Sequence, residues 1–301
     1  MPLLDDNIYT VPKYHFSIAA ANAFASRFYL YIGEWDKAIE CATVALGNNP
    51  ANILRDWGGA VYQGPYASLE TMYGSTEESS NLLLASCISS LGREFILYRH
   101  FFTYDKYIEF VRKPMITGTE WYYKMYGSKD WLLNIPKFKE YFKSDGLNAE
   151  TGVLYAMIPL FTGEETLLNR AEAYAMRNKG GDRDKFLADV NTFMSKRVKG
   201  YSPITSITKM KTAFGNDPKL EPFYPMSEDQ QTMVKCLAFL RRFEFIFEGI
   251  RWFDVKRFNI EVVHAPYDRP EQTDTLKKGD LRRAIQVPVA AQSYNIVPNP
   301  R

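Results

Sequence analysis

The hydrophobic pattern is clearest in the stretch Leu240–Phe258, which reads LRRFEFIFEGIRWFDVKRF. Its apolar positions recur every three or four residues, at Leu240, Phe243, Phe247, Ile250 and Phe253. This spacing predicts one continuous helix with a wide apolar stripe. Gly249 lies in the middle, where a glycine costs about 1 kcal/mol relative to alanine. We therefore expect a central packing helix that comes close to another backbone or ring at Gly249.

Charged side chains beside the stripe fall three residues apart, which places them on one helical face. The expected pairs are Arg241 with Glu244, Glu248 with Arg251, Arg251 with Asp254, and Asp254 with Arg257. On an exposed helix each such pair contributes only about 0.2–0.5 kcal/mol. We expect these charges also to pair with neighbouring segments, which gives the stretch a structural role.

Residues 14–50 show the helix–turn–helix spacing of a tetratricopeptide repeat. The contact positions of such a pair need small side chains, and they hold Ala25, Ala38 and Ala45. We expect a first helix pair here. Trp57 follows the repeat closely and is expected in the core.

Residues 162–199 predict a second, more degenerate helix pair of the same kind. Thr162 and Glu165 form a capping box at its start, with the hydroxyl and the carboxylate each accepting a backbone N–H. The partner helix has a clear apolar face. Its inward positions are Phe186, Val190 and Phe193.

The remaining segments differ in character. Residues 51–152 are rich in glycine and aromatic residues and show no clear secondary-structure pattern. Residues 227–301 begin with a capping box of Ser227 and Gln230, which opens the helix leading into the central stretch. Together these patterns predict a single, mainly α domain over 1–301, with tetratricopeptide-type helix pairs plus a loop-rich region with little strand.

Composition narrows the function classes. The 301 residues carry a net charge of +2, so no nucleic-acid partner is expected. No apolar run of about 18 residues occurs, and we expect no membrane-spanning segment. Met1–Thr10 lacks the signal-peptide pattern, and we expect neither a signal peptide nor a lipidation cysteine in this chain. Three scattered cysteines and three histidines without ligand spacing predict no metal site and no cofactor.

Glu244 and Glu248 are the one carboxylate pair in the sequence that could be considered as catalytic residues. Four residues apart on a helix, their side chains can lie close together, and retaining glycosidases use a pair about 5 Å apart. Each glutamate also has an arginine three residues away, which favours structural ion pairs. No motif for a nucleophile, a phosphate loop or a catalytic metal occurs. No catalytic residue is predicted, and the chain is not expected to be an enzyme.

The order Arg-Arg-x-Glu-x-x-Phe-Glu-Gly-x-Arg-x-x-Asp-x-x-Arg over residues 241–257 resembles the C-terminal signature of the SusD/RagB family. Its main structural positions here are Arg241, Glu244, Glu248, Gly249, Arg251 and Asp254. The segments Gly33–Ala38 and Asn169–Tyr174 are also similar to family segments. The likeness covers Tyr14–Asn49 and the chain from Leu154 onward, whereas family members are usually longer and begin with a lipoprotein signal.

The resemblance implies a SusD-like fold and a non-catalytic function. Family members are outer-membrane lipoproteins of Bacteroidetes that capture oligosaccharides or polysaccharides and cover a TonB-dependent, SusC-like transporter. The chain is therefore expected at the cell surface, where it delivers glycan to that transporter. Two alternatives stay open: a tetratricopeptide-type protein-interaction scaffold without glycan binding and, less favoured, an all-α glycoside hydrolase.

Aromatic side chains are the candidate glycan contacts. An exposed, rigid ring packs on the C–H face of a sugar at low entropic cost. In SusD-like proteins these contacts come from loop aromatics between the repeats, and no motif fixes their positions. The candidates chosen from composition are Tyr104, Tyr107, Trp121, Tyr123 and Trp131. Exposed rings without facing carboxylates favour a binder, carboxylates in an aromatic cleft favour a hydrolase, and buried rings favour a scaffold.

Overall fold

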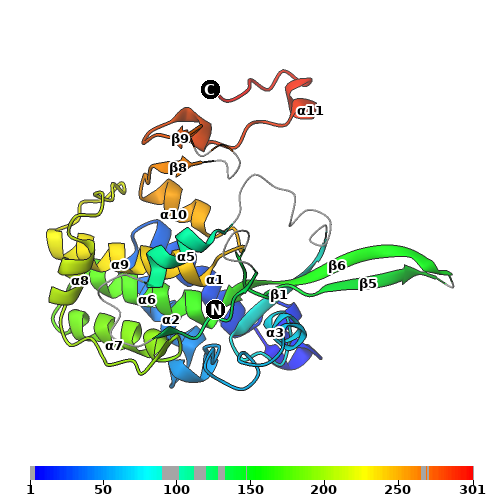
Figure 1. Cartoon of the computed structure of the whole chain (residues 1–301), viewed down its shortest axis with the longest axis horizontal. Helices are drawn as coiled ribbons and strands as arrows, with labels where there is room; N and C mark the ends of the chain where they lie inside the picture. The colour runs from blue at the N-terminus through cyan, green and yellow to red at the C-terminus, as the bar shows by residue number, and fades with distance from the viewer. Residues whose placement is uncertain are drawn as a thin grey trace.

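The computed structural model describes residues 4–89, 102–111, 120–127, 133–146, 148–265, 269 and 271–300. They form a helical body from which a long β-hairpin projects, while the C-terminal segment extends from another side (Figure 1). Within these residues, none of the helices is both long enough and apolar enough to cross a bilayer. The prediction of a mainly α fold is confirmed.

The first predicted helix pair forms as α1 (Ile18–Tyr31) and α2 (Trp35–Leu46). The Ser17 hydroxyl caps α1 by accepting the Ala20 N–H at 3.2 Å. Gly33 adopts a left-handed backbone, with φ of 83°, in the turn between the helices. Small residues at the contact positions are buried and let the helices pack closely; they are Ala25, Ala38 and Ala45.

The second predicted pair forms as α6 (Gly163–Arg177) and α7 (Asp182–Ser195). The Thr162 hydroxyl accepts the Glu165 N–H at 3.3 Å, which is the first half of the predicted capping box. The Glu165 carboxylate instead accepts the Arg27 Nε–H at 2.6 Å, because a guanidinium is a stronger partner than a backbone amide. The predicted inward residues of α7 are fully buried; they are Phe186, Val190 and Phe193.

Helix α6 is the element around which the others pack. It contacts α1, α2, α7 and α9. Almost every residue of α6 is buried, including the acidic side chains of Glu164 and Glu172. The centre of the fold is therefore α6, and the stretch 240–258 covers one of its sides.

The stretch 240–258 contains the end of one helix and a second helix, so the prediction of one continuous helix is wrong. Helix α9 (Glu228–Glu244) begins at the predicted capping box of Ser227 and Gln230. Helix α10 (Arg251–Arg257) follows after an irregular turn. Apolar side chains are buried on both sides of the break, which explains why the helical spacing continues through it.

Two residues with left-handed backbone conformation make this break. The φ angles of Phe247 and Gly249 are 71° and 75°. A left-handed residue costs most amino acids about 1–2 kcal/mol, whereas glycine adopts this conformation freely. The space around Gly249 is open, so the expected close approach of another backbone or ring is also wrong. Gly249 is needed for the turn and not for packing.

A three-stranded antiparallel sheet lies beside the helices, in the order β1-β6-β5. Its strands are β1 (Asn81–Ile88), β5 (Glu140–Asp145) and β6 (Asn148–Thr162). β5 and β6 form the projecting hairpin of Figure 1, in a region to which the sequence assigns no defined structure. β6 continues directly into α6, and its pairing of Thr162 with Asn81 brings the loop-rich region to the start of α6.

The other regular elements are short. In the described part of the chain, the further α-helices are α3 (Tyr66–Tyr73), α5 (Tyr104–Val111), α8 (Thr208–Phe214) and α11 (Val289–Gln292). The short antiparallel ladders are β2 (Glu120–Trp121) with β7 (Val198–Lys199), β3 (Tyr126–Gly127) with β4 (Leu133–Asn134), and β8 (Val262–His264) with β9 (Asp274–Leu276). The 3-10 turns are η1 (Asp6–Ile8), η2 (Pro12–Tyr14), η3 (Pro50–Ile53) and η4 (Leu281–Arg283).

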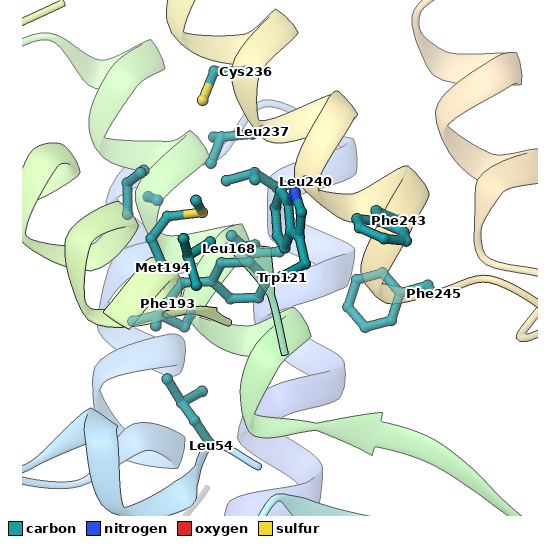
Figure 2. Close-up of a cluster of buried hydrophobic side chains, with 14 of the residues drawn as sticks. Leu54, Trp121, Leu168, Phe193, Met194, Cys236, Leu237, Leu240, Phe243 and Phe245 are labelled. Carbon is teal, nitrogen blue, oxygen red and sulfur yellow. The ribbon is translucent and has the colours of Figure 1, made fainter. Parts of the chain in front are cut away.

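The largest buried cluster gathers side chains from α6, α7 and α9 (Figure 2). Helix α9 contributes Leu237, Leu240 and Phe243, and β2 inserts Trp121 among them. Trp57 belongs to the same cluster and is fully buried, as predicted. The loop-rich region therefore packs on the helical layer and supplies part of its core.

Candidate functional site

Arg197 binds two glutamates deep inside the molecule. Its Nη2 donates to Glu164 Oε1 at 3.0 Å and to Glu244 Oε1 at 2.8 Å. Arg55 Nη1 donates to Glu164 Oε2 at 2.9 Å, and the Tyr123 hydroxyl donates to Glu244. All five side chains are buried. Charge-assisted hydrogen bonds thus join α6, α9 and the loop-rich region where water cannot compete.

The Glu164 carboxyl gives this network a pH dependence. Burial raises its pKa, but the guanidiniums of Arg55 and Arg197 outweigh burial and lower the pKa to about 2. An unfolded glutamate titrates near about 4.3, so the unfolded state binds the proton first and stability is lost as pH falls from about 4.5 towards 2. We expect the urea midpoint to fall across this window, and to fall less steeply in Glu164→Gln. Equal slopes for both proteins would contradict this assignment.

Glu244 and Glu248, the pair weighed for catalysis, are both held by buried partners. Glu248 Oε1 accepts hydrogen bonds from Lys137 Nζ and from the Tyr73 hydroxyl, each at 2.6 Å. These partners come from distant segments and not from the arginines three residues away, so that detail of the prediction is wrong. In the part of the chain that the structure describes, no group of three or more histidine, cysteine or acidic side chains is placed to hold a metal ion.

Asp254 joins the signature helices to α6. The two predicted pairs form, with Arg251 Nη1 3.9 Å and Arg257 Nη2 3.0 Å from its carboxylate oxygens. Arg241 Nε also donates to Asp254 Oδ1 at 3.3 Å. Arg257 Nη2 donates in addition to Glu172 Oε2 of α6 at 2.8 Å. Burial raises the pKa of Asp254, but these arginines outweigh it and lower the pKa. The signature residues therefore connect α9 and α10 to α6 through buried ion pairs.

Two of the predicted glycan-binding rings lie in the core. Trp121 is 6% exposed and Tyr123 is 4% exposed. Their ring centroids lie 4.9 and 4.6 Å from that of Phe243, and Figure 2 shows Trp121 among the buried side chains. The ladder that pairs Trp121 with Val198 turns both rings inward, since side chains two residues apart share a face. This corrects their expected exposure, because neither ring offers its face to a sugar in this arrangement.

Tyr104 and Tyr107 are half-buried on α5. They lie one turn apart, with ring centroids 6.0 Å apart, and pack against the main cluster. Each therefore keeps part of its ring accessible to solvent. Trp131, the fifth candidate, lies outside the described residues.

A second aromatic pair, which the sequence analysis did not select, lies at the surface. Tyr66 of α3 is 37% exposed, and its ring meets that of Tyr126 edge-on with centroids 5.0 Å apart. Asn134 Nδ2 donates to the Tyr66 hydroxyl at 2.7 Å. We call these three residues the Tyr66 platform. Glycines and proline beside both tyrosines, in Gly64-Pro65-Tyr66 and Tyr126-Gly127, were the available signal for surface turns.

The family of the chain follows from a match to a family model. The model described as the SusD family matches residues 138–299, just over half of the chain. The matched region holds the projecting hairpin, the second helix pair and the signature residues 241–257. The chain belongs to the SusD family. The resemblance seen in the signature is thereby confirmed.

Solved structures share the SusD fold. A candidate sugar-binding protein from Bacteroides vulgatus ATCC 8482 has a TM-score of 0.57 and 19% identity, over 99% of this chain and 62% of that chain. A SusD superfamily protein from Bacteroides thetaiotaomicron VPI-5482 has a TM-score of 0.57 and 17% identity, over 97% of this chain and 62% of that chain. NanU from B. fragilis has a TM-score of 0.51 and 16% identity, over 97% and 64%.

At these identities the similarity establishes the fold alone. The chain spans less than two thirds of the length of each of these three structures. No curated protein matches the sequence. The predicted SusD-like fold is confirmed, and the ligand has to be argued from the chain's own surface.

Proposed function

We propose that this SusD-family chain captures oligosaccharide or polysaccharide at the cell surface without cleaving it. The observation that carries the proposal is the family match over residues 138–299. The shared fold of the candidate sugar-binding protein from B. vulgatus supports it. The proposal includes delivery to a TonB-dependent, SusC-like transporter and a location at the outer membrane, and these two parts rest on the family resemblance.

The Tyr66 platform is the surface that we assign to the glycan. A sugar needs an apolar partner for its C–H face and polar partners for its hydroxyl rim. The exposed ring of Tyr66 supplies the first, and the Asn134 amide beside it supplies the second. The half-buried pair Tyr104 and Tyr107 stays in the proposal as a second contact. We assign Trp121 and Tyr123 to the support of the surrounding loops.

Capture without cleavage is favoured by the state of the two glutamates on the signature. Retaining glycosidases need one carboxylate as a nucleophile and a second as a proton donor, both facing the sugar. Here Arg197 holds Glu244 and Lys137 holds Glu248, each in a buried ion pair. The two glutamate side chains are 0% and 2% exposed, so neither is accessible to a sugar at the surface, which disfavours the hydrolase alternative.

The test is a binding titration of the whole chain against a panel of soluble polysaccharides, with reducing ends measured on the same samples. We expect Tyr66→Ala to weaken binding by several-fold to about tenfold, because it removes a stacking ring. Tyr104→Ala tests the second contact in the same way. Tyr294→Ala is the matched control, since Tyr294 is 82% exposed in the C-terminal tail.

The outcomes separate the three functions. Binding without new reducing ends, weakened by Tyr66→Ala or Tyr104→Ala and not by Tyr294→Ala, supports capture at the assigned surface. Release of reducing ends would show a hydrolase. Absence of binding to every glycan would favour the protein-interaction scaffold.

A further inference from the structure

A pocket of about 590 Å³ lies between α9, the start of α10 and the segment 217–220. This volume falls within the ~300–1,000 Å³ range of small-molecule sites. Figure 1 draws α5 across the junction of α9 and α10, and Glu109 of α5 stands at the pocket rim beside Arg242. No residue of the Tyr66 platform lines this pocket, so it is a separate site.

One face of α9 forms a wall of the pocket. Its lining side chains follow the i, i+3, i+4, i+7 spacing of a single helical face, and they are Lys235, Ala238, Phe239 and Arg242. Leu220 and Ile260 extend the apolar part of this wall from neighbouring segments. The pocket therefore combines an apolar surface that suits the C–H face of a ring with cations at its edge.

The pocket carries an excess of positive charge. Five lysine and arginine residues line it against three acidic residues. Two of the lysines are engaged by the protein, since Lys235 Nζ donates to Asp217 O at 2.6 Å and Lys278 Nζ to Glu221 Oε1 at 2.7 Å. Of the other three cations, Arg242 and Arg251 carry planar guanidiniums that can hold a carboxylate with paired hydrogen bonds, which the Lys219 ammonium cannot do.

Among the residues that the structure describes, Arg251 has long contacts with its protein partners. Its Nη1 donates to Ala238 O at 3.3 Å, and the Asp254 carboxylate lies 3.9 Å away. One third of its side chain, 33%, is exposed. Burial, together with repulsion from Arg242 and two further arginines, lowers its pKa to about 10 although Asp254 opposes this. Arg251 is still charged at neutral pH, and a bound anion would relieve the repulsion.

Arg242 pairs with Glu109 at the pocket rim. The two side chains are 3.7 Å apart, and they are 39% and 49% exposed. Glu109 also pairs with Lys106 at 2.6 Å. An exposed pair of this kind contributes about 0–1 kcal/mol, so a ligand can replace it at little cost.

We propose that this pocket binds a sugar that carries a carboxylate, of the hexuronic acid class. The carboxylate lies between Arg242 and Arg251, whose planar guanidiniums match it with paired hydrogen bonds. The ring packs on Phe239 and Ile260. The carboxylate is assigned from the pocket's own charges, whereas the sugar ring rests on the proposed function.

The test is calorimetric titration of the whole chain with galacturonate, galactose and inorganic phosphate. We expect galacturonate to bind at least about tenfold more tightly than galactose, and its affinity to fall between about 50 and 500 mM NaCl. Arg242→Gln should weaken galacturonate about tenfold or more, because it removes a charged hydrogen-bond partner. Lys256→Gln is the matched control, since it removes an exposed charge on α10 outside the pocket and should change nothing.

Several outcomes would overturn the inference. One is equal affinity for galacturonate and galactose. Another is an equal loss of galacturonate affinity in Arg242→Gln and Lys256→Gln. The third is tighter binding of phosphate than of galacturonate. If the chain captures a neutral polysaccharide but does not bind galacturonate, this inference is overturned and the proposed function still stands. Galacturonate binding that depends on Arg242, without capture of any polysaccharide, supports this inference and overturns the capture proposal.

Discussion

Replacing Arg197 with methionine is expected to destabilise the protein by about 3–5 kcal/mol, the usual cost of removing one partner of a buried ion pair. Arg197 is fully buried and faces Glu164 at 3.0 Å and Glu244 at 2.8 Å. Methionine has a similar length but no charge. Glu164 keeps Arg55 as a partner, whereas Glu244 is left with the Tyr123 hydroxyl alone among the partners described above.

Urea unfolding at neutral pH measures this loss. Arg183→Met is the matched control, because Arg183 pairs with Asp229 at 2.5 Å on the surface, where such a pair contributes about 0–1 kcal/mol. Glu244→Gln separates the cause from a simple packing defect. It should cost less in the Arg197→Met background than in the wild-type chain, since the charge it removes no longer has its cation.

Two results would refute this account of the network. One is a decrease in the free energy of unfolding for Arg197→Met that is no larger than the decrease for Arg183→Met. The other is strict additivity between Arg197→Met and Glu244→Gln, which would mean that the two charges do not interact. Either result would move the stabilising role of the signature to the apolar packing of α9.

The sequence predicts the helix pairs but not the partners of the buried charges. Helical spacing and small residues such as Ala38 reveal a helix and its contact face, because both depend on neighbours within one turn. The partners of Glu244 and Glu248 are Arg197 and Lys137, which are remote in the chain. Only the tertiary fold brings them together. The spacing of charges three residues apart therefore predicted the local pairs of Asp254 correctly, but it gave the wrong partners for Glu244 and Glu248.

The aromatic surface shows the same limit. Composition identifies a region rich in rings but does not say which rings are buried. Trp121 is buried because the β2–β7 ladder turns it towards Phe243, and the ladder joins segments that are far apart in the chain. Tyr66 is exposed at the start of a short helix behind Gly64 and Pro65. The density of rings in the sequence thus does not distinguish an exposed ring such as Tyr66 from a buried one such as Trp121.

Replacing Gly163 with alanine is expected to destabilise the protein by about 3 kcal/mol or more, at the upper end of overpacking effects. Gly163 is the first residue of α6, and a Cβ there would lie 1.9 Å from the carbonyl oxygen of Ile53. The clash is with backbone, which a side-chain rotation cannot relieve. The Gly163 N–H also donates to Ser80 O at 2.8 Å, so α6 cannot move away without losing that bond.

Gly180→Ala provides the control, because nothing lies within 4 Å of the position that its Cβ would take. Alanine there restricts the unfolded chain and should be neutral or stabilise by about 0.4–1 kcal/mol. Urea midpoints of both variants, with circular dichroism at each step, measure the difference. A Gly163→Ala protein as stable as Gly180→Ala would mean that α6 does not begin against Ile53. The packing of the Ile53 backbone on the start of α6 would then have to be revised, together with the positions of Arg55 and Trp57, which follow Ile53 in the chain.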